Sequence, residues 1–234
     1  MPIAPPKQPQ ELYRQDLRDR IAAIAPESLL DVGCGKGELL RAATLIACPH
    51  RVGLEVAAAD VGPLREQGVD VRQGRAEALP FEDRSFDVVV LEYVAHHLEG
   101  LERGLAEAAR VARIAVLVLD PWYDLAVPSQ RVAREFDEWS KVIDRRTGLV
   151  HNSCPSAADL AAPFLALGGF AIDYSQRLAL CSVSMETLEA TARDQLAQIP
   201  SDGDVERSLQ RILAQARRDG MSEDGALLLS AARY

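Results

Sequence analysis

The chain has 234 residues, of which 48% are apolar and 26% are charged. This length and composition allow the core of one full α/β domain and exclude a disordered chain. The 26 basic and 35 acidic side chains give a formal net charge of −9, which disfavours binding to the phosphate backbone of a nucleic acid.

The Pro-rich first ten residues lack the apolar core of a signal peptide, and no stretch approaches the roughly 18 apolar residues of a transmembrane helix. The four cysteines lie far apart without metal-ligand spacing, so we expect free thiols and no bound metal. A reducing, cytoplasmic location is the simplest interpretation. The cysteines are Cys34, Cys48, Cys154 and Cys181.

Residues 1–25 are expected to form a short leader and an amphipathic helix over residues 10–25, which Pro26 ends. Short apolar runs rich in β-branched residues then alternate with helical stretches, which is the pattern of βαβ units in a parallel sheet. Strands are expected at residues 29–32, 51–55, 69–73, 86–91 and 114–119. Helices are expected from the turn after the first strand to residue 46, and at residues 60–67 and 99–112.

The alternation is interrupted at residues 121–154, where residues 129–146 are expected to be helical. An insertion after the carboxyl end of a strand follows the usual ligand crevice of such sheets, so we predict a lid here. A helix capped by Ser156 and Asp159 follows, contains Pro163 and ends at Gly168. The sixth strand is expected at residues 170–175, extending at most to residue 183. Helices at residues 184–199 and 204–219 form a second insertion, residues 184–220, before a last strand at residues 226–232.

Together these elements predict one α/β domain over residues 1–234, with a doubly wound, seven-stranded, mostly parallel sheet and helical cap insertions. The strongest local signal within it is LLDVGCGKGELL at residues 29–40, where a buried strand runs into a turn with three glycines. Glycine permits a positive φ and a close approach of ligand to backbone. A turn between strand and helix also directs several amide groups toward one place.

Two ligand classes use such turns. A dinucleotide site has the spacing GxGxxG, and its helix N-terminus faces a pyrophosphate. Here the third glycine comes one residue earlier, and Asp31 precedes the first glycine by two residues. This acid would repel a pyrophosphate but suits a cationic, amino-acid-like ligand.

The combination resembles motif I of the class I S-adenosylmethionine-dependent methyltransferases, and the resemblance extends over most of the chain. It is closest to the small-molecule branch that includes ubiquinone and menaquinone biosynthesis methyltransferases (methyltransferase type 11). It implies a Rossmann-like sheet, S-adenosylmethionine as cofactor and direct methyl transfer to a small-molecule acceptor. In such enzymes an acid at the end of the second strand takes both ribose hydroxyls. Glu55 ends VGLE at that position, where its two oxygens could form a bidentate pair.

Two further segments carry the resemblance. GRAEALPFEDRSFD at residues 74–87 matches the family's GDAEALPFxDxSFD closely, but Arg75 stands where an acid usually receives the adenine amino group. This departure puts the adenine contact in doubt and leaves the Ala76 backbone amide as the group that could bind the adenine ring. LEYVAHHL at residues 91–98 resembles the segment beside the methionine moiety and the acceptor, and Tyr13 resembles a residue that closes over the methionine end. The implied cofactor site comprises Tyr13, Asp31, Gly33, Cys34, Gly35, Gly37, Glu55, Val56, Arg75, Ala76, Glu77, Leu91 and Glu92.

Methyl transfer from a sulfonium needs in-line placement of the reactants, and it needs a base only if the acceptor loses a proton. Histidine suits that role near neutral pH. His96 and His97 follow the fourth strand, so they are the predicted catalytic residues, although neighbours cannot both face the acceptor and a structural role is open for each. The aromatic residues of the predicted lid could stack on a planar acceptor or pack the lid helix in place. They are Trp122, Tyr123, Phe136 and Trp139.

Three other functions stay open. The same fold could methylate RNA or protein, although the acidic charge counts against RNA. Arg75 favours a protein that binds the cofactor and acts as a partner without transferase activity. A nicotinamide-dependent dehydrogenase is disfavoured by the glycine spacing.

Overall fold

The computed structural model describes residues 9–42 and 47–234, and the chain divides into two compact units. The first, which we call the sheet unit, comprises Gln10–Asp120, Cys154–Ser175 and Leu227–Tyr234. The second, the helical unit, comprises in its described part Pro9, Pro121–Ser153 and Gln176–Ala226. The two predicted insertions therefore belong to the same unit, although they are separated in sequence by a helix and a strand of the sheet unit.

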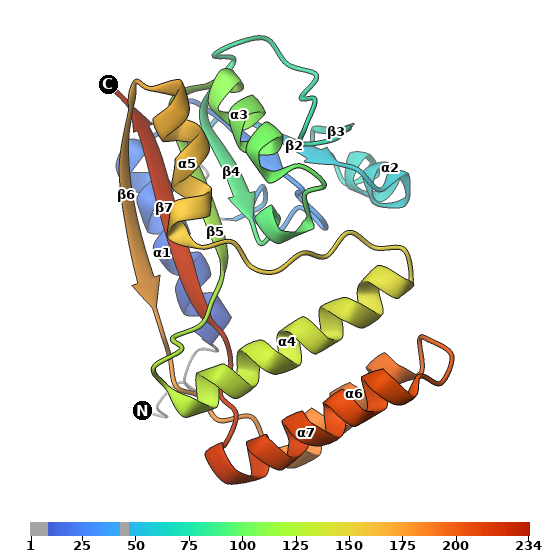
Figure 1. The fold of residues 1–234 in the computed structure, drawn as a ribbon. Coiled ribbons are helices and arrows are strands. Elements are labelled where there is room, and N and C mark those ends of the chain that lie inside the picture. The colour runs from blue at the N-terminus through green and yellow to red at the C-terminus, as the bar shows by residue number, and fades with distance from the viewer. Residues whose placement is uncertain (1–8, 43–46) are drawn as a thin grey trace, which may run out of the picture. The chain divides into compact units, whose positions relative to one another are not determined.

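Seven strands form one sheet in the order β3-β2-β1-β4-β5-β7-β6 (Figure 1). Strands β1 to β5 pair in parallel. The chain leaves β1 toward β2 on one side and returns to β4 on the other, so the topological switch point lies between β1 and β4. Doubly wound sheets bind ligands at this point. The strands are β1 Ser28–Val32, β2 His50–Glu55, β3 Val71–Gln73, β4 Phe86–Glu92, β5 Ala112–Trp122, β6 Phe170–Arg177 and β7 Gly225–Arg233.

Strand β7 runs antiparallel to β6. A Cβ on Gly225, at the start of β7, would lie 2.7 Å from the carbonyl oxygen of Arg177 at the end of β6. At the other end, the Tyr234 amide donates a 3.3 Å hydrogen bond to the carbonyl of Gly169, just before β6 begins. One reversed strand in an otherwise parallel arrangement gives the mostly parallel sheet that the sequence predicts.

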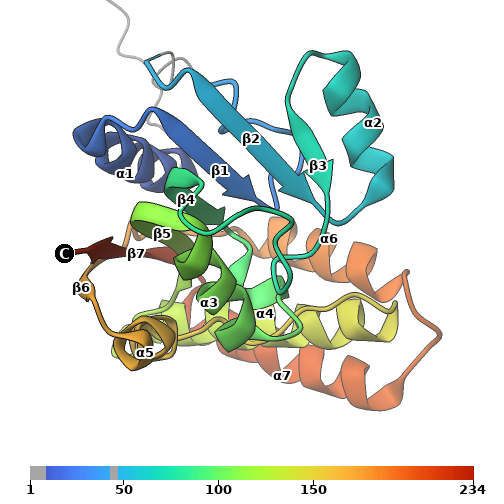
Figure 2. The same ribbon diagram turned by 90° about the horizontal axis from the view of Figure 1, so that it is seen from above.

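Helices cover both faces of the sheet unit. Figure 2 shows α1 (Pro9–Ile24) on one face, and α3 (Leu101–Val111) with α5 (Ala157–Leu167) on the other. The sheet unit also contains α2 (Ala58–Glu66) and a short 3-10 helix, η2 (Ala95–His97). The central strands β1 and β4 are buried throughout except at the end of β4, as their near-continuous apolar sequences require. The predicted doubly wound α/β class is confirmed.

Several element boundaries differ from the prediction; α6, for example, ends at Leu196 instead of residue 199. Residues 38–41, where a helix is predicted to follow the glycine turn, form hydrogen-bonded turns, and residues 43–46 lie outside the described residues. Gly35 and Gly37 have φ values of +49° and +70°, as a glycine turn permits. Strand β3 begins two residues late because the Val69 amide donates to the Leu64 carbonyl and closes the end of α2.

The start of α5 follows its sequence signature. The Asp159 amide donates to the Ser156 hydroxyl over 3.2 Å, and the Ser156 amide donates to an Asp159 carboxylate oxygen over 2.8 Å. This reciprocal capping box fixes the first turn. Pro163 lies inside the helix, which continues to Leu167 before Gly168 ends it.

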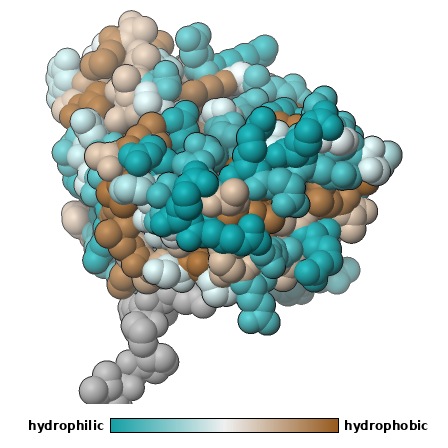
Figure 3. Space-filling view, turned by 60° about the horizontal axis from the view of Figure 1, so that its bottom comes forward, coloured by the Kyte–Doolittle hydropathy of each residue, from teal (hydrophilic) through white to brown (hydrophobic). Residues whose placement is uncertain are grey.

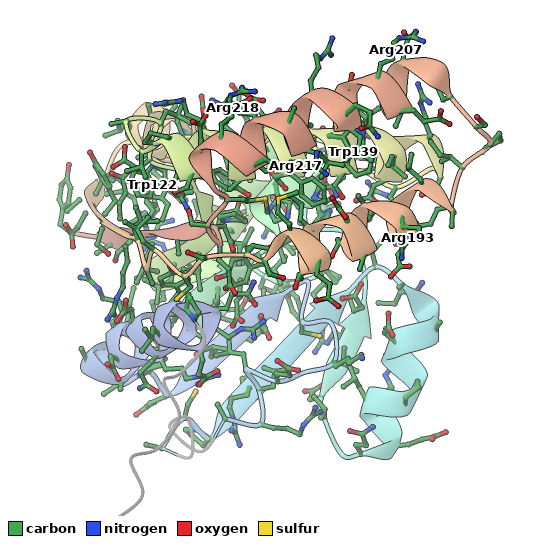
Figure 4. The ribbon with its side chains drawn as sticks, turned by 90° about the horizontal axis from the view of Figure 1, so that it is seen from below. Trp122, Trp139, Arg193, Arg207, Arg217 and Arg218 are labelled. Carbon is green, nitrogen blue, oxygen red and sulfur yellow. The ribbon has the colours of Figure 1, made fainter. Side chains whose placement is uncertain are left out.

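The helical unit is built on α4 (Pro128–Arg146), α6 (Met185–Leu196) and α7 (Gly203–Asp219). Figure 4 shows Trp139 between α4 and α7, and its indole Nε1 donates a 3.0 Å hydrogen bond to the Val205 carbonyl. Phe136 stacks on it with ring centroids 5.3 Å apart. Both rings belong to the unit's core, so these aromatic residues pack the helices together. That core consists of Val132, Phe136, Trp139, Ile143, Leu188, Ala192, Val205, Leu209, Ile212, Leu213 and Ala216.

On the face drawn in Figure 3, apolar side chains show as small areas between hydrophilic ones. Among the helices of the described chain, none has the length and apolar content needed to cross a membrane.

Candidate functional site

A cavity of about 230 Å³ lies in the sheet unit, at the switch point between β1 and β4. It is open at the carboxyl ends of these parallel strands, where the glycine turn leaves β1. The residues that line it are Arg14, Asp31, Gly33, Cys34, Gly35, Lys36, Glu38, Leu39 and Glu92. Five of the predicted cofactor residues thus surround one cavity.

Two positions of the turn, Gly33 and Gly35, have glycine for different reasons. Gly33 has φ +69°, and a Cβ there would lie 2.5 Å from Cγ2 of Val94. Gly35 has φ +49°, but a Cβ there would meet no protein atom within 4 Å. Gly33 is therefore required by the packing of the turn against Val94, whereas the side of Gly35 is open space next to the cavity. Gly37 has φ +70° and completes the bend.

Four amides of the turn, those of Gly33, Cys34, Gly35 and Gly37, are already hydrogen-bonded within the protein. The amides of Gly33 and Cys34 both donate to the Leu54 carbonyl, over 2.8 and 3.0 Å. The Gly37 amide donates to the Cys34 carbonyl over 2.7 Å. The turn thus contributes shape and close approach at these positions, because the ladder between β1 and β2 continues into it.

Glu55 supports the turn through its carboxylate. Oε2 accepts a 3.0 Å hydrogen bond from the Gly35 amide, and Oε1 accepts bonds of 2.8 and 3.1 Å from the amides of Val56 and Ala57. A carboxylate oxygen has two lone pairs, so Oε2 retains one acceptor position. Glu55 therefore joins the tip of β2 to the turn after β1 and can accept one further donor through Oε2.

Asp31 is the central charged group of the cavity. Its side chain is buried, and burial, followed by the nearby carboxylates of Glu92 and Glu55, raises its pKa well above the usual range. Among the described residues, no basic side chain forms an ion pair with it. A cation bound in the cavity would restore the carboxylate and offset the cost of its burial.

Glu92 and Arg14 form the opposite wall. Arg14 Nε donates to Glu92 Oε1 over 2.6 Å, and Nη1 lies 3.9 Å from Glu38 Oε2. Arg14 therefore neutralises Glu92, whereas Asp31 has no ion-pair partner among the described residues. The sequence did not single out Arg14. It lies next to the predicted Tyr13, which is fully buried and does not line the cavity.

The other predicted cofactor residues lie outside the cavity lining. Arg75 is half-exposed, and its Nη2 pairs with Glu99 Oε2 over 2.7 Å. Glu77 Oε1 accepts the amides of Glu99 and Gly100 over 2.9 and 3.3 Å, at the start of α3. Ala76 and Leu91 are buried, whereas Val56 is exposed. Cys34 does line the cavity, and burial, with Asp31 and Glu55 nearby, raises the pKa of its thiol to about 12. It is therefore a neutral thiol near pH 7.

The two histidines after β4 have different environments. His96 is buried, and its Nδ1 lies 2.9 Å from Oδ1 of Asp120, a fully buried residue of β5. His97 is exposed, although the two rings are only 4.2 Å apart between centroids. The tight bend before them holds Tyr93 at φ +56°. The sequence placed both histidines at this edge but did not predict the pair with Asp120, because that contact depends on β5 lying beside β4.

Asp87 has a structural role at the opposite end of the sheet. Its Oδ2 accepts the amides of Glu27 and Ser28 over 2.9 and 3.2 Å, and Oδ1 accepts Arg113 Nε over 2.7 Å. These bonds join the start of β4 to the start of β1, away from the cavity at the carboxyl ends.

Residues 30–118 match the family described as "Methyltransferase domain". Over 111 residues the chain is 32% identical to demethylmenaquinone methyltransferase of Thermobifida fusca (strain YX), a match that covers 45% of this chain and 47% of that protein. Over 99 residues it is 33% identical to the uncharacterized methyltransferase YcgJ of Bacillus subtilis (strain 168), covering 38% of each chain. The match thus spans less than half the length of each relative.

The similarity of folds extends further along the chain. The crystal structure of YcgJ has a TM-score of 0.66 at 20% identity and covers 95% of this chain and 98% of that one. The [4+2]-cyclase SpnF has a TM-score of 0.56 at 22% identity, covering 93% of this chain and 80% of that one. At such identities the likeness shows the fold alone. Together with the family match, it supports the predicted resemblance to methyltransferases: residues 30–118 match a methyltransferase domain, within a fold that the two structures share over more than nine tenths of this chain.

Proposed function

We propose that the protein transfers a methyl group from S-adenosylmethionine to a small-molecule acceptor. The observation that carries this proposal is the buried Asp31 carboxyl, which lines the cavity beside the glycine turn and forms no ion pair with a basic side chain of the described residues. S-adenosylmethionine carries an ammonium group and a sulfonium group, so it supplies the missing positive charge. A dinucleotide would bring phosphates to the same carboxylates and be repelled.

Different residues in and near the cavity contact different parts of the cofactor. Asp31 pairs with the ammonium of the methionine moiety, and Gly35 leaves room for the ligand to approach the backbone. Glu55 accepts a ribose hydroxyl through the remaining acceptor position of Oε2. Arg75 is engaged with Glu99, so the adenine is held by the Ala76 backbone and by packing, without an acid at position 75.

The acceptor lies at the next pair of strands. His96 follows β4, and Asp120 lies in the part of β5 that extends beyond the end of β4. Because β1, β4 and β5 are parallel, their carboxyl ends meet at one edge of the sheet. We therefore place the acceptor near His96 and His97. The lid function of residues 121–154 stays a prediction.

A small molecule is favoured over RNA by the ion pairs of the two arginine doublets, Arg145-Arg146 and Arg217-Arg218. Arg217 pairs with Glu189 over 2.6 Å, and Arg146 pairs with Asp202. Arg145 and Arg218 donate to the carbonyls of His151 and Ala214 and keep their charge. One arginine of each doublet is thus neutralised by an acid, which reduces the positive charge offered to a phosphate backbone. The demethylmenaquinone methyltransferase similarity also favours a small acceptor.

Cofactor selectivity tests the proposal directly. We expect S-adenosylmethionine and S-adenosylhomocysteine to raise the unfolding temperature, whereas NAD leaves it unchanged. A metabolite extract incubated with methyl-labelled cofactor should then yield a labelled small molecule and S-adenosylhomocysteine. Cofactor binding without label transfer to any extract fraction would instead support a non-catalytic partner protein, and stabilisation by NAD alone would contradict the proposal.

Asp31→Asn tests the charged contact. Binding of a cation ionises Asp31 and releases its proton, so cofactor affinity should rise with pH through the raised pKa of this group. The variant should bind about 10- to 100-fold more weakly near neutral pH, because a charged hydrogen bond is lost, and its affinity should vary less with pH. Calorimetric titration with S-adenosylhomocysteine at several pH values measures both effects.

The stability of the ligand-free protein provides a control, because its expected pH dependence has the opposite sign to that of cofactor affinity. Because the folded state holds the Asp31 proton more tightly, wild-type stability should fall as pH rises from the ordinary carboxyl range toward the raised pKa. Asp31→Asn should lose this fall in a series of urea unfolding curves. Equal pH dependence in the two proteins would show that Asp31 is ionised in the free state.

Gly35→Ala tests whether the open space beside this residue is used by the ligand. The methyl group meets no protein atom within 4 Å, so we expect a stability loss of about 1–2 kcal/mol from the positive φ alone, together with at least about tenfold weaker cofactor binding. Gly33→Ala should lose more stability because of Val94. Gly62→Ala, in α2 and open on all sides, is the matched control and should leave affinity unchanged. Normal binding by Gly35→Ala would move the ligand away from this turn.

Ribose recognition by Glu55 is tested with an analogue. Wild-type protein should bind the 2′-deoxy and 3′-deoxy forms of S-adenosylhomocysteine with unequal affinities, one of them about tenfold more weakly than the parent compound. Glu55→Gln should bind all three more weakly but with little discrimination, because the charged acceptor is gone. Retention of full discrimination in Glu55→Gln would show that Glu55 only supports the turn.

A further inference from the structure

Three metal-ligating side chains come together in the sheet unit outside the cofactor cavity. A ring nitrogen of His96, a carboxylate oxygen of Asp120 and Sγ of Cys154 all lie within 4.8 Å of one another. They come from η2, from β5 and from the segment just before α5. The sequence predicted no metal, because residues so far apart in the chain show no ligand spacing.

Asp120 provides a second, independent observation. The residue is 0% exposed, and its Oδ1 is 2.9 Å from His96 Nδ1. Its Oδ2 is buried and has no hydrogen-bond partner among the described residues. A buried carboxylate oxygen without a protein partner is costly, so a bound water molecule or ion is expected to complete it.

We propose that His96, Asp120 and Cys154 bind one divalent transition-metal ion of the zinc type. Imidazole nitrogen, carboxylate oxygen and thiolate sulfur are the three donors that zinc accepts, at about 2.0–2.3 Å, so donors within 4.8 Å of one another can share one ion. The thiolate disfavours magnesium and calcium. One thiolate and one carboxylate balance the two positive charges of the ion while the imidazole stays neutral.

The scaffold holds the three ligands at fixed places. Asp120 belongs to a strand that pairs in register with β4. The bend that leads to His96 is tied to the same strand, because the Tyr93 amide donates to the Leu119 carbonyl over 2.7 Å. Cys154 precedes the capping box of α5 by two residues. Asp120 thus lies on a strand, which positions a ligand more accurately than a loop does, and Cys154 lies in the irregular segment just before α5.

Three protein ligands leave the fourth zinc position open, which is the pattern of catalytic zinc sites. This step rests on the proposed methyl transfer. An acceptor hydroxyl that occupies the open position has a lowered pKa and loses its proton to solvent. The oxygen lone pair then forms the new O–C bond while the C–S bond breaks, with its electron pair left on sulfur as S-adenosylhomocysteine. His96 acts here as a ligand, and the acceptor class is a hydroxyl compound.

Metal uptake tests the site with the full-length protein. After treatment with a chelator and dialysis, titration with Zn²⁺ or Co²⁺ should give one ion per chain. The Co²⁺ form should show the d–d bands of four-coordinate cobalt and a thiolate-to-metal charge-transfer band. Cys154→Ser should lose the charge-transfer band and weaken binding at least about 100-fold. Cys181→Ser, which changes an exposed cysteine of the helical unit, should behave as wild type.

The same proteins separate this inference from the proposed function. S-adenosylhomocysteine binding, measured by calorimetry, should be equal in wild-type and Cys154→Ser proteins, which also shows that the variant is folded. Cofactor binding without stoichiometric metal uptake would overturn the metal site and leave His96 and Asp120 as a metal-free pair. Metal uptake that is identical in wild-type and Cys154→Ser proteins would also overturn it. Metal uptake without cofactor binding would overturn the methyltransferase proposal alone.

Discussion

The burial of Asp31 is the constraint on which the arrangement of the cofactor site depends. A carboxyl at the end of a central strand is surrounded by apolar neighbours, and the nearest charged groups, Glu92 and Glu55, repel its ionised form. Arg14 pairs with Glu92 and three backbone amides donate to Glu55, whereas no basic side chain of the described residues forms an ion pair with Asp31. Of the three acids, Asp31 is thus the one whose ionised form a positively charged ligand would stabilise most.

The glycine turn lines the same cavity as Asp31. Because the amides of Gly33 and Cys34 continue the ladder to β2, the turn is held rigidly without a ligand. Rigidity reduces the entropy lost on binding, so the cavity is prepared for its ligand before the ligand arrives. Glu55 contributes to the same effect by joining the end of β2 to the Gly35 amide.

Most of the fold could be predicted from the sequence because its strands and helices are marked by local periodicity and by caps. The α5 capping box at Ser156 and Asp159 is an example in which two side chains fix a boundary that a reader of the sequence can place. Residues 38–41 are the counterexample. The sequence predicts that a helix follows the glycine turn, but these residues form hydrogen-bonded turns in the structure.

The candidate site divides in the same way. The residues at its cofactor end, 31–37 and Glu55, belong to short motifs that can be recognised in the sequence. The second cluster cannot be recognised in this way, because His96 and Asp120 meet only once β4 pairs with β5. Cys154 joins them only once α5 has packed on α3. Spacing rules detect metal or catalytic groups within one turn or hairpin, and they fail for ligands carried on three separate elements.

The same division explains why the fold alone does not identify a reaction. A [4+2]-cyclase shares this architecture with proteins named as methyltransferases, so the sheet and its glycine turn define what can be bound and leave the chemistry to other groups. In this chain those groups lie at the ends of β4 and β5, beside the cofactor cavity but on different strands. One carboxylate oxygen of Asp120 is buried there and has no hydrogen-bond partner among the described residues. The metal ion that we propose would complete that oxygen, and it would distinguish the acceptor end of the site from the cofactor end.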